Sequence, residues 1–126
     1  MQGKMQWSFR FRFTSAKKVY FAFFYPWSNE ENSRFLNGLE SRCKQDPSIY
    51  WYRAPIIRSL EGRPVEFLVI SSNKFKLHKE DKIEDEHLFK GIKKPHGFAG
   101  EKKAIVISAR VHPGEVPGSH VMTGIL

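Results

Sequence analysis

The feature that most constrains the fold is the run Ala104-Ile105-Val106-Ile107-Ser108-Ala109. A short, continuous run with many β-branched residues is typical of a strand in the middle of a sheet that is covered on both faces. Sheets of that kind occur in α/β proteins, whose helices provide the cover. We therefore expect an α/β fold in which residues 104–109 form the best core strand.

Two more strands are predicted near the N-terminus. Residues Trp7 to Thr14 alternate strictly between large apolar and polar side chains, which is the period of a strand with one buried face. After a turn-like stretch at 15–18, residues Val19 to Tyr25 form a continuous aromatic run. This run predicts a more deeply buried strand, antiparallel to the first and ended by Pro26.

A helix is expected from about Asn29 to Lys44. Ser28 and Glu31 have the spacing of a capping box, in which each side chain accepts a hydrogen bond from the other residue's backbone N–H. Large apolar residues then recur at helical spacing, at Phe35, Leu36 and Leu39.

A β-hairpin is predicted after this helix. Its strands are the extended runs Tyr50 to Leu60 and Val65 to Ile70, and Gly62 suits the positive φ of a tight connection. Residues 71–103 are polar, charged and interrupted by glycine and proline. We expect them to form a long surface connection with only a short helical stretch near residues 85–90.

Length and composition indicate a folding, soluble protein. The 126 residues suit one domain, and 40% are hydrophobic. No apolar run of about 18 residues could span a bilayer, and the first seven residues lack the features of a secretory signal. The single cysteine, Cys43, cannot form an internal disulfide, so we expect an ordinary thiol and an intracellular location. The apolar end at 121–126 indicates a segment of a longer protein.

The net charge of +8 predicts attraction to polyanions, but charge alone does not choose between nucleic acid, membrane and acidic protein segments. The basic residues form only small clusters, at 17–18, 93–94 and 102–103. No pattern of a nucleic-acid-binding module accompanies them, so we do not expect nucleic acid as a partner.

The loop after the predicted core strand carries the most informative chemistry, because it reads Arg110-Val111-His112-Pro113-Gly114-Glu115. Ligands of open α/β sheets bind just beyond the carboxyl ends of strands, where this loop is expected. The Pro-Gly bend can turn His112 and Glu115 toward one point, and imidazole and carboxylate are ligand types of a His₂Glu zinc site. A histidine and a glutamate at this spacing also occur by chance, so a plain surface pair is the alternative. An apolar, helix-like stretch follows, with Val121, Met122 and Ile125.

Two motifs in this sequence resemble those of a known family. The stretch 108–119 closely resembles the R-V-H-P-G-E-T zinc motif of the cytosolic carboxypeptidases, a branch of the zinc carboxypeptidase superfamily that removes glutamates from tubulin. The stretch 58–65 resembles the R-S-x-E-G-R-P hairpin of zinc carboxypeptidases, at the expected place before the zinc strand. Residues 8–13, 20–26 and 49–53 are similar to the type that removes branch-point glutamates, so the resemblance covers nearly the whole chain.

The resemblance implies that His112 and Glu115 are metal ligands of one Zn²⁺. It also implies a truncated α/β fold, in which residues 1–26 are the last strands of an antiparallel β accessory domain. Residues 27–126 are then the N-terminal part of the catalytic domain, the start of a mixed α/β sheet. Val116 stands where the family has threonine.

The remaining active-site residues of the family lie beyond the part that this sequence resembles. They are a third ligand, the arginine and asparagine that hold the substrate carboxylate, and the glutamate that activates water. We therefore assign no catalytic residue here and expect this chain alone to be inactive. The other histidines are expected to face solvent or to cap elements, and these are His78, His87, His96 and His120.

For the whole protein, the resemblance implies a metallocarboxypeptidase that removes glutamate from polyglutamylated tubulin or other acidic protein tails. It further implies a cytoplasmic, microtubule-associated enzyme with no membrane partner, and the basic charge suits an acidic substrate. The alternative is a non-catalytic basic module that binds acidic tails or other polyanions.

Overall fold

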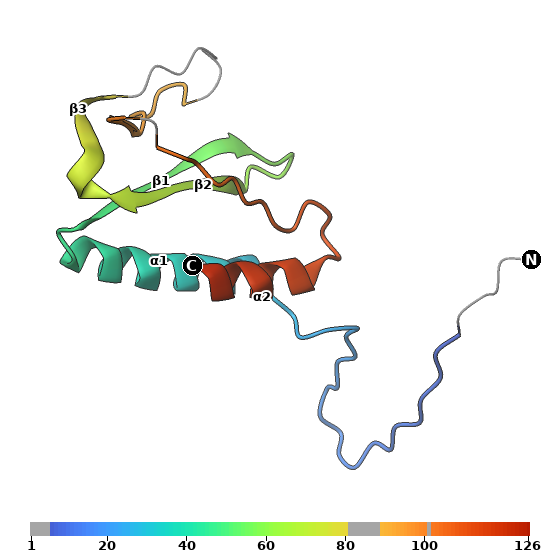
Figure 1. Ribbon diagram of the computed structural model, residues 1–126. Coiled ribbons are helices and arrows are strands. Elements are labelled where there is room, and N and C mark those ends of the chain that lie inside the picture. The colour runs from blue at the N-terminus through green and yellow to red at the C-terminus, as the bar shows by residue number, and fades with distance from the viewer. Residues whose placement is uncertain (1–5, 81–88, 101) are drawn as a thin grey trace, which may run out of the picture.

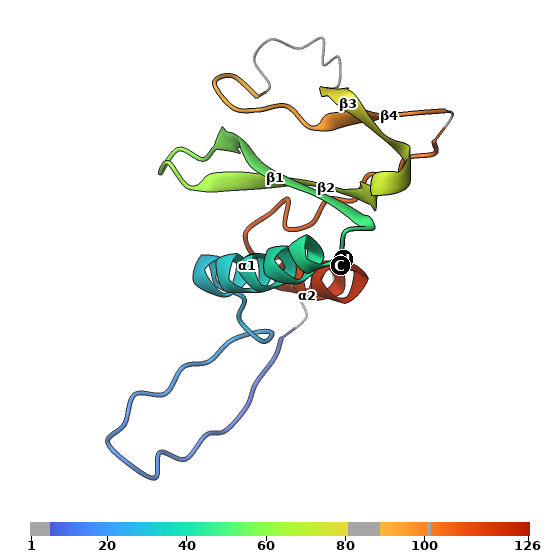
Figure 2. The same ribbon diagram turned by 90° about the vertical axis from the view of Figure 1, so that its left-hand side faces the viewer.

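Two helices and two small antiparallel sheets make up the regular structure of the described residues. The computed structural model describes residues 6–80, 89–100 and 102–126. In chain order the elements are α1 (Asn29–Gln45), β1 (Ile49–Arg58), β2 (Pro64–Ser72), the 3₁₀ turn η1 (Asn73–Phe75), β3 (Lys76–Glu80), β4 (His96–Phe98) and α2 (Val116–Ile125). Both helices lie on one side of the β1–β2 hairpin, and β3 and β4 lie on the other (Figures 1 and 2). Within the described part of the chain, no helix is both long and apolar enough to cross a bilayer.

Helix α1 forms where the sequence predicts it, and its capping box is confirmed. The Glu31 N–H donates to Ser28 Oγ at 3.1 Å, and the Ser28 N–H donates to Glu31 Oε2 at 2.6 Å. These bonds satisfy two backbone donors that the first helical turn leaves without partners. The buried face of α1 consists of Leu36, Leu39 and Cys43.

The predicted hairpin is also confirmed, as β1 and β2. Gly62 has a φ of 75° at the turn, the conformation that glycine adopts without steric cost. The register shifts between Pro55 and Ile57. Pro55 has no N–H to donate to the ladder, which explains the irregularity at this point. Arg53 then ties the hairpin to the helix, since its guanidinium lies 2.8 Å from Glu66 Oε1 on β2 and 3.4 Å from Glu40 Oε2 on α1.

Residues 71–103 contain more structure than the surface connection we expected. They include η1, β3 and β4, and β3 pairs with β4 in antiparallel fashion. Apolar contacts cover the hairpin here, because Phe98 packs against Tyr50 at 5.3 Å between ring centroids and Phe89 packs against Phe67 at 5.5 Å. The sequence does not predict these contacts, because an isolated aromatic residue in a polar stretch gives no sign of which distant residue it packs against. The helical stretch expected near 85–90 falls largely outside the described residues.

The two predicted N-terminal strands do not form. Residues 6–26 instead make a U-shaped arm that projects from the helices and strands (Figures 1 and 2). The two limbs run antiparallel, as expected, since Phe9 and Phe21 lie 5.1 Å apart and Trp7 and Phe23 lie 6.2 Å apart between ring centroids. No strand is assigned in the described part of this arm. The aromatic side chains of the arm are exposed, Phe23 by 91%, because the described helices and strands do not form a layer over it.

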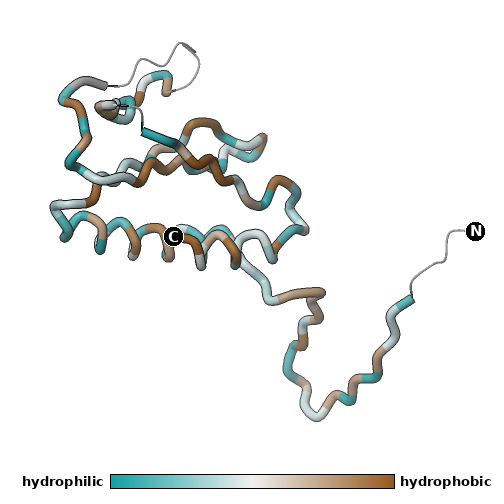
Figure 3. The backbone as a smooth tube through the Cα atoms, viewed as in Figure 1, coloured by the Kyte–Doolittle hydropathy of each residue, from teal (hydrophilic) through white to brown (hydrophobic). Residues whose placement is uncertain are grey.

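The prediction of a core strand at 104–109 is wrong for this structure. The segment is extended but unpaired within the described residues, and Val106 is 93% exposed. Figure 3 shows how apolar it is. A β-branched run becomes a buried strand only when neighbouring strands satisfy its backbone groups and further layers cover its faces. The described sheets are both antiparallel pairs, so the expected mixed sheet is not formed here.

The total surface area agrees with this open arrangement. The chain exposes 11528 Å². A compact monomer of the same mass, 14.7 kDa, is expected to expose about 6,900 Å². The buried apolar side chains of the described residues are Leu36, Leu39, Cys43, Tyr50, Ala54 and Phe89. Among the described residues, only the junction of α1, the hairpin and residue 89 therefore resembles a protein core.

Candidate metal centre

The loop with the predicted metal ligands lies directly before α2. Arg110 has a φ of 63°, which is uncommon for a residue with a side chain and turns the chain sharply after the extended segment. The Glu115 N–H then donates to the His112 carbonyl oxygen at 3.1 Å and closes the bend that the Pro-Gly sequence predicts. The helix predicted after the loop is confirmed as α2, and a proline in its first turn needs no intrahelical hydrogen bond.

His112 and Glu115 meet side chain to side chain. Nδ1 of His112 lies 2.6 Å from Oε1 of Glu115, and because a carboxylate oxygen only accepts, Nδ1 carries the proton. The His112 side chain is 75% exposed and that of Glu115 is 55% exposed. Glu115 occupies the N-cap position of α2, where the partial positive charge of a helix N-terminus favours a carboxylate. The bend thus brings the two side chains together, as predicted, and both are accessible to solvent.

Arg110 holds this loop in place through its side chain. Its Nε donates to the Pro113 carbonyl oxygen at 2.7 Å. Its Nη1 donates to the Trp27 carbonyl oxygen at 3.0 Å and to Ser119 Oγ at 3.3 Å. The loop is therefore bonded both to the start of α1 and to α2. The sequence analysis included Arg110 in the motif but gave it no role. Its role could have been predicted from its position, because a long side chain with five N–H donors stands directly beside a tight bend.

No other described histidine completes a metal-binding group with His112 and Glu115. His78 is exposed, as expected. His120 is not, because its ring packs between Trp27 at 5.2 Å and Phe24 at 5.5 Å, and its Nε2 donates to the Tyr25 carbonyl oxygen at 3.2 Å. His96 is half-buried, and its Nδ1 is buried without a partner among the described residues. His87 lies outside the described residues.

The donor set fits part of a zinc site. An imidazole and a carboxylate are both zinc ligands, and here they face each other on an accessible loop. A catalytic zinc takes three protein ligands. Within residues 6–80, 89–100 and 102–126, no group of three or more histidine, cysteine, aspartate or glutamate side chains could hold a metal ion. His112 and Glu115 can therefore contribute ligands but do not complete a site among these residues.

Comparison with known proteins finds relatives that match 94% of this chain and share the name cytosolic carboxypeptidase. The chain is 33% identical over 130 aligned residues to "Cytosolic carboxypeptidase-like protein 5" from Homo sapiens, covering 94% of this chain and 15% of that protein. It is 34% identical over 119 residues to "Cytosolic carboxypeptidase 6" from Caenorhabditis elegans, covering 94% and 20%. The Mus musculus protein of the latter name is 31% identical over 120 residues, covering 94% and 18%.

No family model matches the chain, and no solved structure matches it. The relatives nevertheless agree in name across vertebrates and a nematode, and each match runs over nearly the full length of this sequence. The chain therefore belongs to the cytosolic carboxypeptidase family and spans 15 to 20% of the length of these relatives.

Proposed function

We propose that the chain is part of a zinc metallocarboxypeptidase in which His112 and Glu115 bind the metal. The observation that carries this proposal is the 2.6 Å approach of His112 Nδ1 to Glu115 Oε1, on a loop that Arg110 holds against both helices. Family membership supports it, since the relatives are named as carboxypeptidases. In the whole enzyme, residues 104–109 would enter the mixed α/β sheet of the zinc carboxypeptidases and gain the neighbours they need.

Zinc, when bound, polarises the scissile carbonyl and lowers the pKa of its water. The residues of this chain bind and orient the metal. His112 and Glu115 would hold the metal, and a ring nitrogen of His112 would have to be free of its proton to serve as a ligand. Arg110 fixes the backbone of the loop that carries both side chains. A third ligand and a residue that activates water must come from elsewhere in the protein. We therefore propose that residues 1–126 alone are not catalytic.

The proposed substrate is a protein that carries glutamate chains, such as polyglutamylated tubulin. The net charge of +8 supports this choice, because a basic surface attracts an acidic tail. The branch-point type of glutamate removal, a cytoplasmic location and association with microtubules belong to the same proposal.

A direct test compares two variants of the full protein. His112→Ala combined with Glu115→Gln should abolish release of glutamate from polyglutamylated tubulin and should lower the zinc content of the purified protein. His78→Ala, which changes an exposed histidine away from the loop, should alter neither. Glutamate release that survives the double substitution would rule out the proposed metal ligands.

The same variants separate the enzyme from the alternative, a non-catalytic module that binds polyanions. Under that alternative, the wild-type protein releases no glutamate and binds acidic peptides equally well with and without His112 and Glu115. Zinc content that depends on both residues would exclude it.

A further inference from the structure

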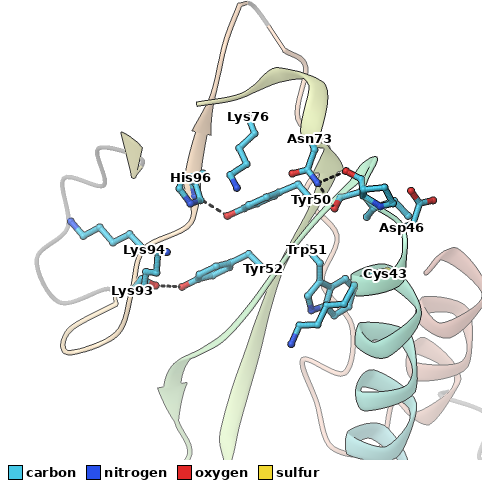
Figure 4. Close-up of a pocket in the computed structure, with 13 residues that line it drawn as sticks. Cys43, Asp46, Tyr50, Trp51, Tyr52, Asn73, Lys76, Lys93, Lys94 and His96 are labelled. Atoms are coloured by element: carbon cyan, nitrogen blue, oxygen red, sulfur yellow. Dashed lines mark hydrogen bonds between the residues drawn. The ribbon is translucent and has the colours of Figure 1, made fainter. Parts of the chain in front are cut away.

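A cleft of about 340 Å³ lies at the opposite end of α1 from the metal loop. Its walls come from the C-terminal end of α1, the first residues of β1, the start of β3 and the segment that leads into β4. Figure 4 shows Tyr50 and Tyr52 of β1 pointing across it toward His96 and Lys93. Among the described residues, the charged side chains of the lining are four lysines and one aspartate, namely Lys44, Lys76, Lys93, Lys94 and Asp46.

Hydrogen bonds between distant parts of the chain hold the cleft together. The His96 N–H donates to Tyr50 Oη at 2.8 Å, and Tyr52 Oη donates to the Lys93 carbonyl oxygen at 2.6 Å. The Asn73 side chain bridges the other wall by donating to the Ile49 carbonyl oxygen at 2.7 Å. The backbone that carries the lysines is therefore fixed against β1.

The cleft carries surplus positive charge. Lys44 pairs with Glu40 at 2.6 Å, and the Asp46 carboxylate accepts two hydrogen bonds from Ser48. The ammonium of Lys76 lies 5.6 Å from the centre of the Tyr50 ring, a cation–π contact that leaves its charge unneutralised. Burial raises the pKa of Tyr50, so its phenol stays neutral and adds no negative charge. Lys44 is exposed as well but is paired with Glu40, so Lys76 and Lys93 are the exposed lysines of the lining that form no ion pair with a described residue.

We propose that this cleft binds a carboxylate-rich peptide segment, with Lys76 and Lys93 as the principal contacts. It is distinct from the metal loop. Arg110 bonds to Trp27, just before α1, whereas Cys43 at the other end of α1 lines the cleft. Seventeen helical residues separate the two ends by about 25 Å.

This separation predicts which substrates can bind the cleft and the metal loop at the same time. The prediction rests on the proposed function. An extended chain covers at most about 3.3 to 3.6 Å per residue. A glutamate tail that is cut near His112 and Glu115 must therefore carry acidic residues about eight positions away to reach the cleft. Shorter tails would bind at the metal loop alone.

An acidic peptide suits the cleft better than nucleic acid does. Single-stranded nucleic acid is bound by aromatic faces on which bases stack. Of the lining aromatic residues, Tyr50 is buried and packs edge-on against His96 and Phe98. The Tyr52 ring packs against Phe67 and Phe89, so both tyrosine rings are already engaged within the protein. The described lining also has no arginine, the residue best suited to phosphate groups.

Fluorescence anisotropy with a labelled oligoglutamate peptide tests this site in the full chain at low ionic strength. Lys76→Gln combined with Lys93→Gln should weaken binding about fivefold to tenfold, as expected for two exposed charge contacts. Lys17→Gln combined with Lys18→Gln removes the same charge from the N-terminal arm and should change binding less than twofold. If both double variants lost the same amount of oligoglutamate affinity, the effect would be one of overall charge and the proposal would be overturned.

Two further measurements complete the test. The Lys76→Gln and Lys93→Gln double variant should keep the zinc content of the wild-type protein, so failure of the cleft proposal and failure of the metal-centre proposal give different results. A single-stranded oligonucleotide of equal charge should bind more weakly than the peptide. Tighter oligonucleotide binding that depends on Lys76 and Lys93 would assign the cleft to nucleic acid instead. Circular dichroism confirms that each variant keeps its helices.

Discussion

The Nη1 atom of Arg110 lies 3.0 Å from the carbonyl oxygen of Trp27, although 83 positions separate the two residues in sequence. This bond fixes the loop of His112 and Glu115 relative to the start of α1. The same guanidinium also bonds Pro113 inside the loop and Ser119 in α2. The geometry of the metal loop therefore depends on a residue that binds no metal itself.

Replacing Arg110 by glycine or by alanine separates its backbone role from its side-chain role. Both variants lose the three hydrogen bonds. Only alanine also retains a Cβ at a φ of 63°, which costs about 1 kcal/mol relative to glycine. We expect Arg110→Ala to unfold more easily in urea than Arg110→Gly by this amount, and both to bind zinc more weakly than wild type. Equal stability of the two variants would contradict the left-handed conformation at residue 110.

Removal of the N-cap of α1 should destabilise the protein measurably. Ser28→Ala leaves the Glu31 N–H without its acceptor and should lower the free energy of unfolding by about 1 kcal/mol. Ser33→Ala, at an exposed position inside the same helix, is the matched control and should be neutral or slightly stabilising. Urea unfolding followed by circular dichroism measures both, and a larger loss for Ser33→Ala would contradict the capping box.

The carboxylate of Glu31 in the capping box predicts how the free energy of unfolding depends on pH. Hydrogen bonds from Ser28, first from its backbone and then from its side chain, lower the pKa of Glu31 below the ordinary value of 4.5. Because the folded state binds this proton less tightly than the unfolded state, the contribution to stability is complete above pH 4.5. It is lost as the pH falls through the folded pKa. Glu31→Gln should flatten the fall of unfolding free energy below pH 4.5, and an unchanged slope would disprove the linkage.

Truncation of two large apolar side chains should have unequal effects. Leu36 is 4% exposed in the face of α1 that packs on β1, so Leu36→Ala should cost about 2 to 4 kcal/mol of unfolding free energy. Phe23 is 91% exposed on the N-terminal arm, and Phe23→Ala should cost less than about 0.5 kcal/mol. Chemical denaturation of both variants measures the difference. A large loss for Phe23→Ala would show that the arm is covered in solution.

Electrostatic attraction of an acidic substrate should weaken with salt. At 0.1 M ionic strength, charges more than about 10 Å apart are largely screened, so a rate that depends on attraction to the basic surface must fall as salt is added. We expect kcat/KM of the full enzyme on a glutamate-rich peptide to fall across a salt titration while kcat changes little. A value of kcat/KM that does not change with salt would remove the basis for electrostatic steering.

Local sequence signals predicted the elements whose stabilising contacts are local. Ser28 and Glu31 lie three positions apart and cap α1 by themselves, and Gly62 closes the hairpin with neighbouring residues. The pairing of His112 with Glu115 was predictable for the same reason, because one tight bend brings the two together. The metal role of this pair was inferred from family resemblance and stays a prediction.

Long-range contacts decided the rest, and these have no local signature. Whether residues 104–109 become a buried strand depends on neighbours that pair with them and layers that cover them, and the described residues provide neither. The bonds of Arg110 to Trp27 and of Tyr52 to Lys93 join segments far apart in sequence. The sequence alone determined the N-cap of α1, the hairpin turn and the pairing of His112 with Glu115, since each depends on residues a few positions apart. Only the tertiary structure decided what is buried, what holds the metal loop and where the lysine cleft forms, because burial and charge clustering depend on which distant segments meet.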